Sequence, residues 1–360
     1  MNNFYKKRYE LIPQMKEYDS IETIWKPYVM FFNKPNVKND IYSLDKYGLR
    51  HNDLFDENLN LNKFENSIFN KSLFKKKFDQ TAAIVGGSAI FGTGASKDKY
   101  TIPNILSSKS NIHYFNLGCS AFNGFQEIIN FQIFQEKMEG IKKIIIYSGL
   151  NDIFLTYFNK IHDEEYDSHY FSKIYLKNIQ SKSNRLSIKK RIMLFFFSDF
   201  VDQNFDWKNS SYKKIIYEIF KKGDKNNIVI NKNDVLRKIL NKNLKIWANY
   251  QKSLNIEVIY VLQPFSNWCS KENSEEENQL FSIMENTKIK INEIYKELDY
   301  NSYLEYKKIL EDLTKKYNLK FLDANSHIDA KFNKEWLFVD RGHLNDRGNE
   351  IISEFINTKI

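Results

Sequence analysis

Two short segments at opposite ends of the chain carry side chains suited to acyl transfer through a serine. Ser88 follows two glycines in Gly86-Gly87-Ser88, and His343 comes three residues after Asp340. A serine hydroxyl becomes a good nucleophile only when a base removes its proton, and an imidazole can do this near neutral pH. A carboxylate on the second ring nitrogen fixes the tautomer and stabilises the imidazolium. These residues predict a catalytic triad of Ser88, His343 and Asp340.

The same chemistry needs hydrogen-bond donors for the oxyanion that forms at the attacked carbonyl. The sequence offers three candidates, which are the backbone N–H of Ser88, the backbone N–H of Gly118 and the side-chain amide of Asn151. Removing one such donor typically costs ~10²–10³ in turnover. We therefore expect an oxyanion hole formed by Ser88, Gly118 and Asn151.

Each of these segments follows a run of apolar residues, directly or after a connecting loop. The runs predict strands at 81–86, 112–117, 143–148, 257–262 and 319–323. Helical patterns lie between them at 126–139, 235–253, 278–298 and 303–317. Short, nearly continuous apolar strands that alternate with helices are typical of a parallel sheet covered on both faces. The sequence therefore predicts an α/β protein, a three-layer α/β/α sandwich around a five-stranded, mainly parallel sheet. Ligands bind such sheets at the carboxyl ends of the strands.

Two segments do not fit the alternation. Residues 1–77 are polar and aromatic, and we expect them to form an N-terminal extension that packs on the core. The α/β domain then runs from 78 to 360. Within it, the insertion 155–230 is far longer than an ordinary connection and has one expected helix, around 212–222. It is either a lid or specificity element, or a surface ornament.

The four segments, in this order and after these strands, resemble the SGNH (GDSL-type) hydrolases. That family brings a serine, a glycine, an asparagine and a histidine to one site, with an aspartate three residues before the histidine. The resemblance covers about residues 78–360 and implies the flavodoxin-like SGNH fold. It implies the following roles: Ser88 as nucleophile, His343 as base, Asp340 as its orienter, and Gly118 and Asn151 as oxyanion donors.

The N-terminal part and the serine segment refine the resemblance. Residues Trp25 to Arg50 look like the extension of some bacterial members of the family. One departure stands next to the nucleophile, since the aspartate that precedes the family's serine is replaced by Gly87. That aspartate is not a triad member, so its absence affects the subfamily and not the predicted chemistry.

These features predict a serine-dependent ester hydrolase that works through an acyl-enzyme and needs no metal or organic cofactor. The resemblance implies removal of a short O-acyl group, and we expect an acetyl group on a carbohydrate or a related ester. One alternative is an O-acyltransferase of surface polysaccharide that uses the same triad. Another is a catalytically silent member that binds glycans or acts as a scaffold.

Composition limits the remaining classes of function. The chain has 360 residues, with 54 Lys and Arg against 45 Asp and Glu, a formal charge of +9. The basic residues are spread along the chain, so we do not expect nucleic-acid binding. The chain begins with no apolar signal and has no run long enough to span a bilayer, which predicts a cytoplasmic protein. A basic and apolar run at 184–197 leaves peripheral membrane contact open, and the oligomeric state stays open too.

Two further motifs are better explained by structural roles than by catalysis or metal binding. Cys119 and Cys269 are the only cysteines, too few for a disulfide framework, and Cys119 is expected to be a small buried thiol. The acidic and histidine-containing segment 162–169 could offer metal ligands, but acidic loops are usually just solvated.

Overall fold

A five-stranded parallel sheet forms the centre of the protein. The computed structural model describes residues 3–54, 67–158, 231–285 and 289–360, and the statements below concern these residues. The strands are β3 (Gln80–Gly86), β4 (Ile112–Gly118), β5 (Ile141–Ser148), β6 (Glu257–Leu262) and β7 (Lys320–Asp323). Their order is β4-β3-β5-β6-β7, and every neighbouring pair is parallel. The five strands predicted from the sequence are thus confirmed, with shifts of no more than a few residues at their ends.

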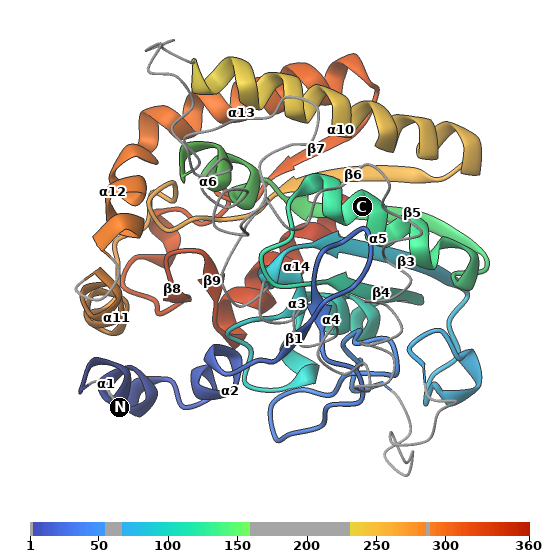
Figure 1. The fold of residues 1–360 in the computed structure, drawn as a ribbon, viewed down its shortest axis with the longest axis horizontal. Coiled ribbons are helices and arrows are strands. Elements are labelled where there is room, and N and C mark those ends of the chain that lie inside the picture. The colour runs from blue at the N-terminus through green and yellow to red at the C-terminus, as the bar shows by residue number, and fades with distance from the viewer. Residues whose placement is uncertain (1–2, 55–66, 159–230, 286–288) are drawn as a thin grey trace, which may run out of the picture. The chain divides into compact units, whose positions relative to one another are not determined.

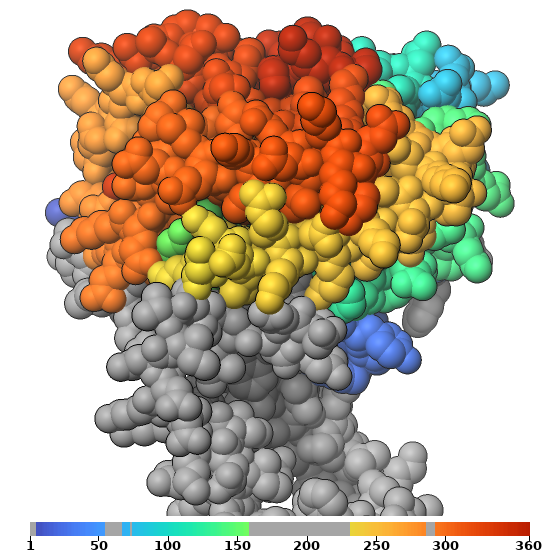
Figure 2. Space-filling model, turned by 90° about the horizontal axis from the view of Figure 1, so that it is seen from above, coloured from blue at the N-terminus to red at the C-terminus, as the bar shows by residue number. Residues whose placement is uncertain are grey.

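Helices cover both faces of this sheet (Figure 1). One group consists of α5 (Gly124–Phe134), α6 (Leu150–Phe158), α10 (Lys232–Leu254) and α13 (Tyr300–Lys316). The other group consists of α3 (Ser88–Phe91), α4 (Ile102–Lys109), α11 (Glu275–Glu285) and α14 (Asp346–Lys359). Helix α12 (Ile289–Glu297) contacts α6 of the first group and α11 of the second. Figure 2 shows α10 in yellow and α13 in orange side by side over one face. This is the predicted three-layer α/β/α architecture.

The strands are mostly apolar because both of their faces are buried. In β3, Ala82 and Ile84 join a core that includes Leu106 of α4 and Ile352 of α14. Ala83 points to the opposite face and is equally inaccessible to solvent. Successive side chains of a strand alternate between faces, so a strand between two helical layers is apolar at most of its positions.

The direction in which the chain crosses the sheet reverses after β4, so that β3 lies between β4 and β5. From β3 the chain crosses to β4 on one side, and it then returns past β3 to β5 on the other side. In the register, Gly86 at the end of β3 lies beside Gly118 of β4 and Tyr147 of β5. The segments that follow these strands therefore leave the sheet at one edge, where open α/β sheets bind their ligands.

The C-terminal part adds a small hairpin above this edge. It consists of β8 (Phe338–Asp340) and β9 (His343–Leu344), which pair antiparallel with Asp340 opposite His343. Asn345 then caps α14 by accepting a hydrogen bond from the Gly348 N–H at 2.9 Å. A tight turn followed directly by a capped helix fixes where this hairpin ends.

The N-terminal segment begins on the α3–α14 side of the sheet and then reaches the α5 side, where Phe69 stacks on Phe134 of α5. Its elements are α1 (Asn3–Leu11), α2 (Met15–Asp19), β1 (Thr23–Ile24), β2 (Phe32–Asn33) and the 3-10 turn η1 (Lys71–Leu73). Figure 1 shows α1 in dark blue beneath α11, and α2 next to β9. Met15 and Tyr18 of α2 belong to the same apolar core as α4 and α14.

Three more 3-10 turns complete the described elements, and one predicted helix differs from the structure. The other 3-10 turns are η2 (Asp98–Tyr100), η3 (Gln135–Lys137) and η4 (Ala330–Phe332). The helix predicted at 278–298 is replaced by α11 and α12, and residues 286–288 between them lie outside the described part. The helix expected near 212–222 and all of the insertion beyond 158 also lie outside it. No helix in the described ranges is both long and apolar enough to cross a membrane.

Candidate active site

Ser88 begins a very short helix at the carboxyl end of β3. Helix α3 spans only Ser88–Phe91 and ends at Gly92, whose φ of 94° is in the left-handed region that glycine adopts without strain. The Gly92 N–H closes the turn by donating to the Ser88 carbonyl at 3.0 Å. Because Ser88 is the first helical residue, its own N–H has no acceptor within the helix. This N–H is therefore available to a ligand.

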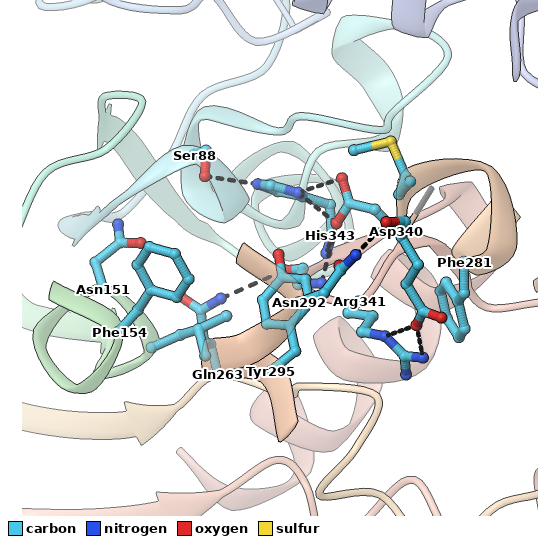
Figure 3. A pocket seen from close by; sticks show the side chains of 14 residues that line it. Ser88, Asn151, Phe154, Gln263, Phe281, Asn292, Tyr295, Asp340, Arg341 and His343 are labelled. Atoms are coloured by element: carbon cyan, nitrogen blue, oxygen red, sulfur yellow. Dashed lines mark hydrogen bonds and ion pairs between the residues drawn. The ribbon is translucent and has the colours of Figure 1, made fainter. Parts of the chain in front are cut away.

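The three predicted triad residues form one continuous chain of polar contacts (Figure 3). Ser88 Oγ lies 2.6 Å from His343 Nε2. The other ring nitrogen, Nδ1, lies 2.7 Å from Asp340 Oδ1 and 2.9 Å from Oδ2. The sequence prediction for these residues agrees with this geometry, although Ser88 and His343 are 255 positions apart.

The β8–β9 hairpin explains why the acid and the base meet. Asp340 and His343 are opposite each other in its register, and Asp340 Oδ1 also accepts from the N–H groups of Gly342 and His343, each at 3.0 Å. Burial raises the pKa of Asp340, but the His343 ring, its hydrogen bond and the Arg8 cation outweigh this and hold that pKa well below its usual range. Asp340 is therefore a carboxylate at neutral pH.

Asn151 supplies an amide beside the nucleophile. It lies in the first turn of α6, directly after β5, and its Nδ2 donates one hydrogen to the Phe122 carbonyl at 2.7 Å. The second Nδ2 hydrogen remains for a ligand. A Cβ placed on Gly87 would lie only 2.5 Å from this Nδ2. The amide thus occupies the space that a side chain at position 87 would need.

Gly118 is not placed as an oxyanion donor, and this part of the sequence prediction is wrong. Its N–H donates to Asn116 Oδ1 at 3.0 Å and is buried. A Cβ on Gly118 would lie 2.2 Å from the Phe91 backbone nitrogen and 2.6 Å from the Ile90 carbonyl carbon. The position needs glycine because the backbone of α3 packs directly on β4. The residue type was informative, but the reason for it is packing.

The turn after Gly118 is the part of the site that sequence reasoning missed. The Phe122 N–H donates to the Cys119 carbonyl at 3.3 Å, and Ala121 within this turn has a φ of 61°. The turn directs the Phe122 carbonyl towards Asn151. A left-handed alanine is uncommon, and nothing in its residue type signals the conformation. Cys119 in the same turn is fully buried, and burial raises the pKa of its thiol, so it is not a nucleophile.

A cavity of about 200 Å³ opens in front of the triad. Its lining is mainly apolar and includes Leu150, Phe154, Phe281, Met284 and Tyr295. Figure 3 shows Asn151 and Phe154 on the side of Ser88 and Arg341 on the far side. The Arg341 guanidinium bonds Glu285 and Asn267 and covers the Phe281 ring. Its charge is therefore neutralised within the wall.

A second, more polar pocket of about 610 Å³ adjoins this cavity. The two share the side chains of Glu285, Asn292, Tyr295 and Arg341. The rest of the second pocket is lined by Asn267, Lys296, Asp299 and Tyr300. An apolar cavity at the nucleophile with a polar pocket beside it can take the two halves of an ester of different polarity.

Arg50 of the N-terminal segment holds the helix that carries Ser88. Its side chain is fully buried, and it donates to the carbonyls of Phe91 at 2.9 Å and Gly92 at 3.0 Å, at the end of α3. It also pairs with Asp98 at 2.7 Å. Carbonyls at a helix C-terminus have no intrahelical donors, so this cation satisfies them. The sequence marks Arg50 as a landmark of the extension but gives no sign of this contact.

The described residues contain no group of three or more His, Cys, Asp or Glu side chains that could hold a metal ion. The segment 162–169 lies outside the described residues, so its predicted role as a solvated loop stays a prediction.

The fold and the site together define an α/β/α protein with a Ser–His–Asp arrangement at the carboxyl edge of its sheet. No family model matches the chain, and no curated protein matches it. Among solved structures, it is similar to a member of the lipolytic protein G-D-S-L family from Veillonella parvula, with 13% identity and a TM-score of 0.38 over 76% of this chain and 94% of that one.

Two further structures show a comparable likeness. An acetylxylan esterase from Geobacillus stearothermophilus has 11% identity and a TM-score of 0.38, over 79% of this chain and 94% of that one. A two-domain esterase active on acetylated mannans has 11% identity and a TM-score of 0.36, over 78% of this chain and 47% of that one. At these identities the likeness is one of fold, so the chemistry is argued from the site.

Proposed function

We propose that this protein is a serine-dependent ester hydrolase of the SGNH type. The observation that carries the proposal is the unbroken contact chain from Ser88 Oγ through the His343 ring to Asp340, at 2.6 and 2.7 Å. These are hydrogen-bond distances, and they meet the geometric test for a nucleophile, its base and the group that orients the base. A partly buried carboxylate behind the ring and an open cavity in front of the hydroxyl complete the arrangement.

In the first half-reaction, Ser88 Oγ attacks the carbonyl carbon of the ester. The hydroxyl proton moves to His343 Nε2 while the carbonyl π electrons move to oxygen, and Asp340 stabilises the imidazolium. When the tetrahedral intermediate collapses, the bond to the alcohol oxygen breaks and Nε2 returns the proton to the leaving alcohol. The acyl group is then bound to Ser88 Oγ.

In the second half-reaction, water takes the place of the alcohol. His343 Nε2 accepts a proton from water as its oxygen attacks the acyl carbon, and the bond to Ser88 Oγ breaks in the collapse that follows. The proton passes from Nε2 to Oγ, which restores the enzyme and releases the carboxylic acid. The Ser88 N–H and the second N–H of Asn151 serve as oxyanion donors in both steps.

The two pockets support a small acyl group on a polar alcohol. About 200 Å³ bounded by Leu150, Phe154 and Phe281 suits a short acyl chain and excludes a long one. The adjoining pocket offers amide, carboxylate and ammonium side chains beside the half-exposed ring of Tyr300. Such groups hydrogen-bond and stack on sugars, so the proposed substrate is a short O-acyl ester, such as an acetyl ester, of a carbohydrate.

Hydrolysis of p-nitrophenyl acetate, together with labelling by a fluorophosphonate serine probe, tests the proposal. The wild-type protein should release p-nitrophenol and become labelled, and Ser88→Ala should do neither while keeping the circular dichroism spectrum and melting temperature of the wild type. His343→Ala should lose turnover as well. Wild-type protein that is inert in both assays would support the silent, glycan-binding alternative and would contradict the proposed hydrolase.

The polar pocket also favours a second candidate, an O-acyltransferase. The acyl-enzyme is common to both reactions, and an acceptor hydroxyl held in that pocket would replace water in the second half-reaction. Incubation with an acetyl ester and with oligosaccharide acceptors separates the two functions by mass spectrometry. Acetylated oligosaccharide is the product of a transferase, and acetate alone is the product of a hydrolase.

A further inference from the structure

Arg8 lies behind the triad, although it belongs to the first helix of the chain. It is in the last turn of α1, and 2% of its surface is exposed. One terminal nitrogen bonds Asp19, and the other lies 3.8 Å from Asp340 Oδ2. The third nitrogen, Nε, is buried with no hydrogen-bond partner among the described residues. A buried guanidinium is thus held between two carboxylates, one of which is the triad acid.

The two oxygens of Asp340 have different environments. Oδ1 receives three hydrogen bonds, from His343 Nδ1 and from the backbone N–H groups of Gly342 and His343. For Oδ2, the polar contacts found among the described residues are His343 Nδ1 at 2.9 Å and the Arg8 guanidinium at 3.8 Å. Besides His343, the Arg8 cation is therefore the polar group found next to the oxygen that the hairpin backbone does not contact.

The cation nearest to Asp340 in sequence does not do this. Arg341 directs its guanidinium to Glu285 and Asn267, in the wall of the cavity. Arg8, in contrast, is not among the residues that line the cavity. Its influence on the reaction must therefore pass through Asp340, without contact to a substrate.

We propose that Arg8 is a positioning residue of the triad, which fixes the Asp340 carboxylate so that it faces His343 as the imidazolium forms. This inference rests on the proposed function, because it assigns Arg8 to the same reaction. In the attack step the ring gains a charge in a poorly solvated place, so a carboxylate that is ionised and correctly oriented lowers the barrier. Losing Arg8 should lower kcat and leave KM unchanged.

The charge on Arg8 also affects how Asp340 titrates. The charged and titratable groups that face Asp340 are His343 in the hairpin, Arg8 in α1, and Tyr295 with Arg341 on the cavity side. Because the Arg8 cation favours the carboxylate, removing it should raise the pKa of Asp340. The decline of kcat on acidification should then begin at a higher pH than in the wild type.

The test must avoid a simple loss of folding. Replacing the buried Arg8 alone removes its ion pair with Asp19, which then keeps the Tyr9 hydroxyl at 3.1 Å as its remaining partner among the described residues. The variant of choice is therefore Arg8→Gln with Asp19→Asn, which replaces the pair by two neutral side chains that can hydrogen-bond. Asp19→Asn alone is the matched control, since it keeps the cation next to Asp340. Arg8→Lys tests rescue by charge.

Steady-state kinetics with p-nitrophenyl acetate from pH 4 to 9, with melting temperatures, gives the answer. We expect kcat of the double variant to fall about tenfold relative to Asp19→Asn, with KM unchanged, and its acid limb to move to higher pH. Arg8→Lys should recover part of kcat. A folded double variant with the kcat and pH profile of Asp19→Asn would overturn the role of Arg8. An inactive, unlabelled wild type would instead overturn the proposed function, and this inference with it.

Discussion

The side-chain amide of Asn151 lies directly over Gly87, so close that a Cβ on Gly87 would be 2.5 Å from Nδ2. The same Nδ2 donates to the Phe122 carbonyl at 2.7 Å. The amide is therefore fixed from two sides, by a carbonyl that orients it and by a backbone that leaves room for it. The size of residue 87 thus determines whether the Asn151 amide can lie beside Ser88.

Gly87→Ala should impair catalysis without unfolding the protein. The atom that the new methyl group would meet is the end of a side chain, which can rotate away, so the cost falls on the position of the amide. We expect kcat to fall by ~10²–10³, as for the loss of an oxyanion donor. The double variant Gly87→Ala/Asn151→Ala should be no worse than Asn151→Ala. Additive losses in kcat would show that Gly87 acts independently of the amide.

Asp340→Asn should reduce kcat by up to ~10⁴, because the amide favours the wrong tautomer of His343.

The effect of Asp340→Asn on the free energy of unfolding should depend on pH. The pKa of Asp340 is lowered in the folded state, so the carboxylate stabilises the fold above its ordinary pKa near 3.8 and loses that contribution as the pH falls below it. Urea unfolding at several pH values checks this. The difference in unfolding free energy between wild type and variant should be constant near neutrality and change below about pH 4. A difference that does not change below about pH 4 would contradict the assignment.

Phe154→Ala should shift the preference towards longer acyl chains. Phe154 forms part of the wall beside Ser88 in a cavity of about 200 Å³. Truncating the ring lengthens the cavity, and each methylene that fits a hydrophobic pocket changes kcat/KM by about tenfold or more. We expect the ratio of kcat/KM for p-nitrophenyl octanoate over acetate to rise by at least about tenfold.

Tyr300→Ala provides the matched control for that ratio, since Tyr300 lines only the adjoining polar pocket. Its removal should leave the chain-length preference as in the wild type. If both variants altered the ratio equally, the acyl group would not be confined to the cavity next to Phe154.

His113 should make the protein less stable in acid. Its ring is packed among Phe74, Phe78 and Phe115, with centroids 4.2, 5.1 and 4.6 Å away. Burial lowers the pKa of His113 from 6.5 to about 3. Between these pH values the unfolded chain binds a proton that the folded chain does not. The unfolding free energy therefore falls by about 1.4 kcal/mol for each unit by which the pH is lowered.

Replacement by phenylalanine should remove this dependence. The unfolding free energy of His113→Phe should fall less steeply than that of the wild type between pH 6 and 4, and the two should run parallel above pH 7. The buried Asp45, whose pKa is raised to about 6, acts in the opposite direction and is common to both proteins. Equal slopes in wild type and variant below pH 6 would refute the role of His113.

The sequence alone determined the sheet and predicted that Ser88, His343 and Asp340 meet. The five strands are mostly apolar because both faces of the sheet are buried, and this signal is local. Ser88 after β3 and the Asp340–His343 pair after the last strand were identified in the same way. Residues that follow parallel strands must come to one edge, so the order of the segments already implies that they meet.

Only the tertiary structure decided what surrounds these residues. The N–H of Gly118 is taken up by Asn116, Gly87 is matched to the Asn151 amide, and Arg8 and Arg50 reach Asp340 and α3 from the N-terminal segment. These contacts join positions far apart in the chain, or depend on which way one amide turns. No periodicity or spacing encodes them, because their energy comes from packing and charge pairing that exist only once the chain has folded.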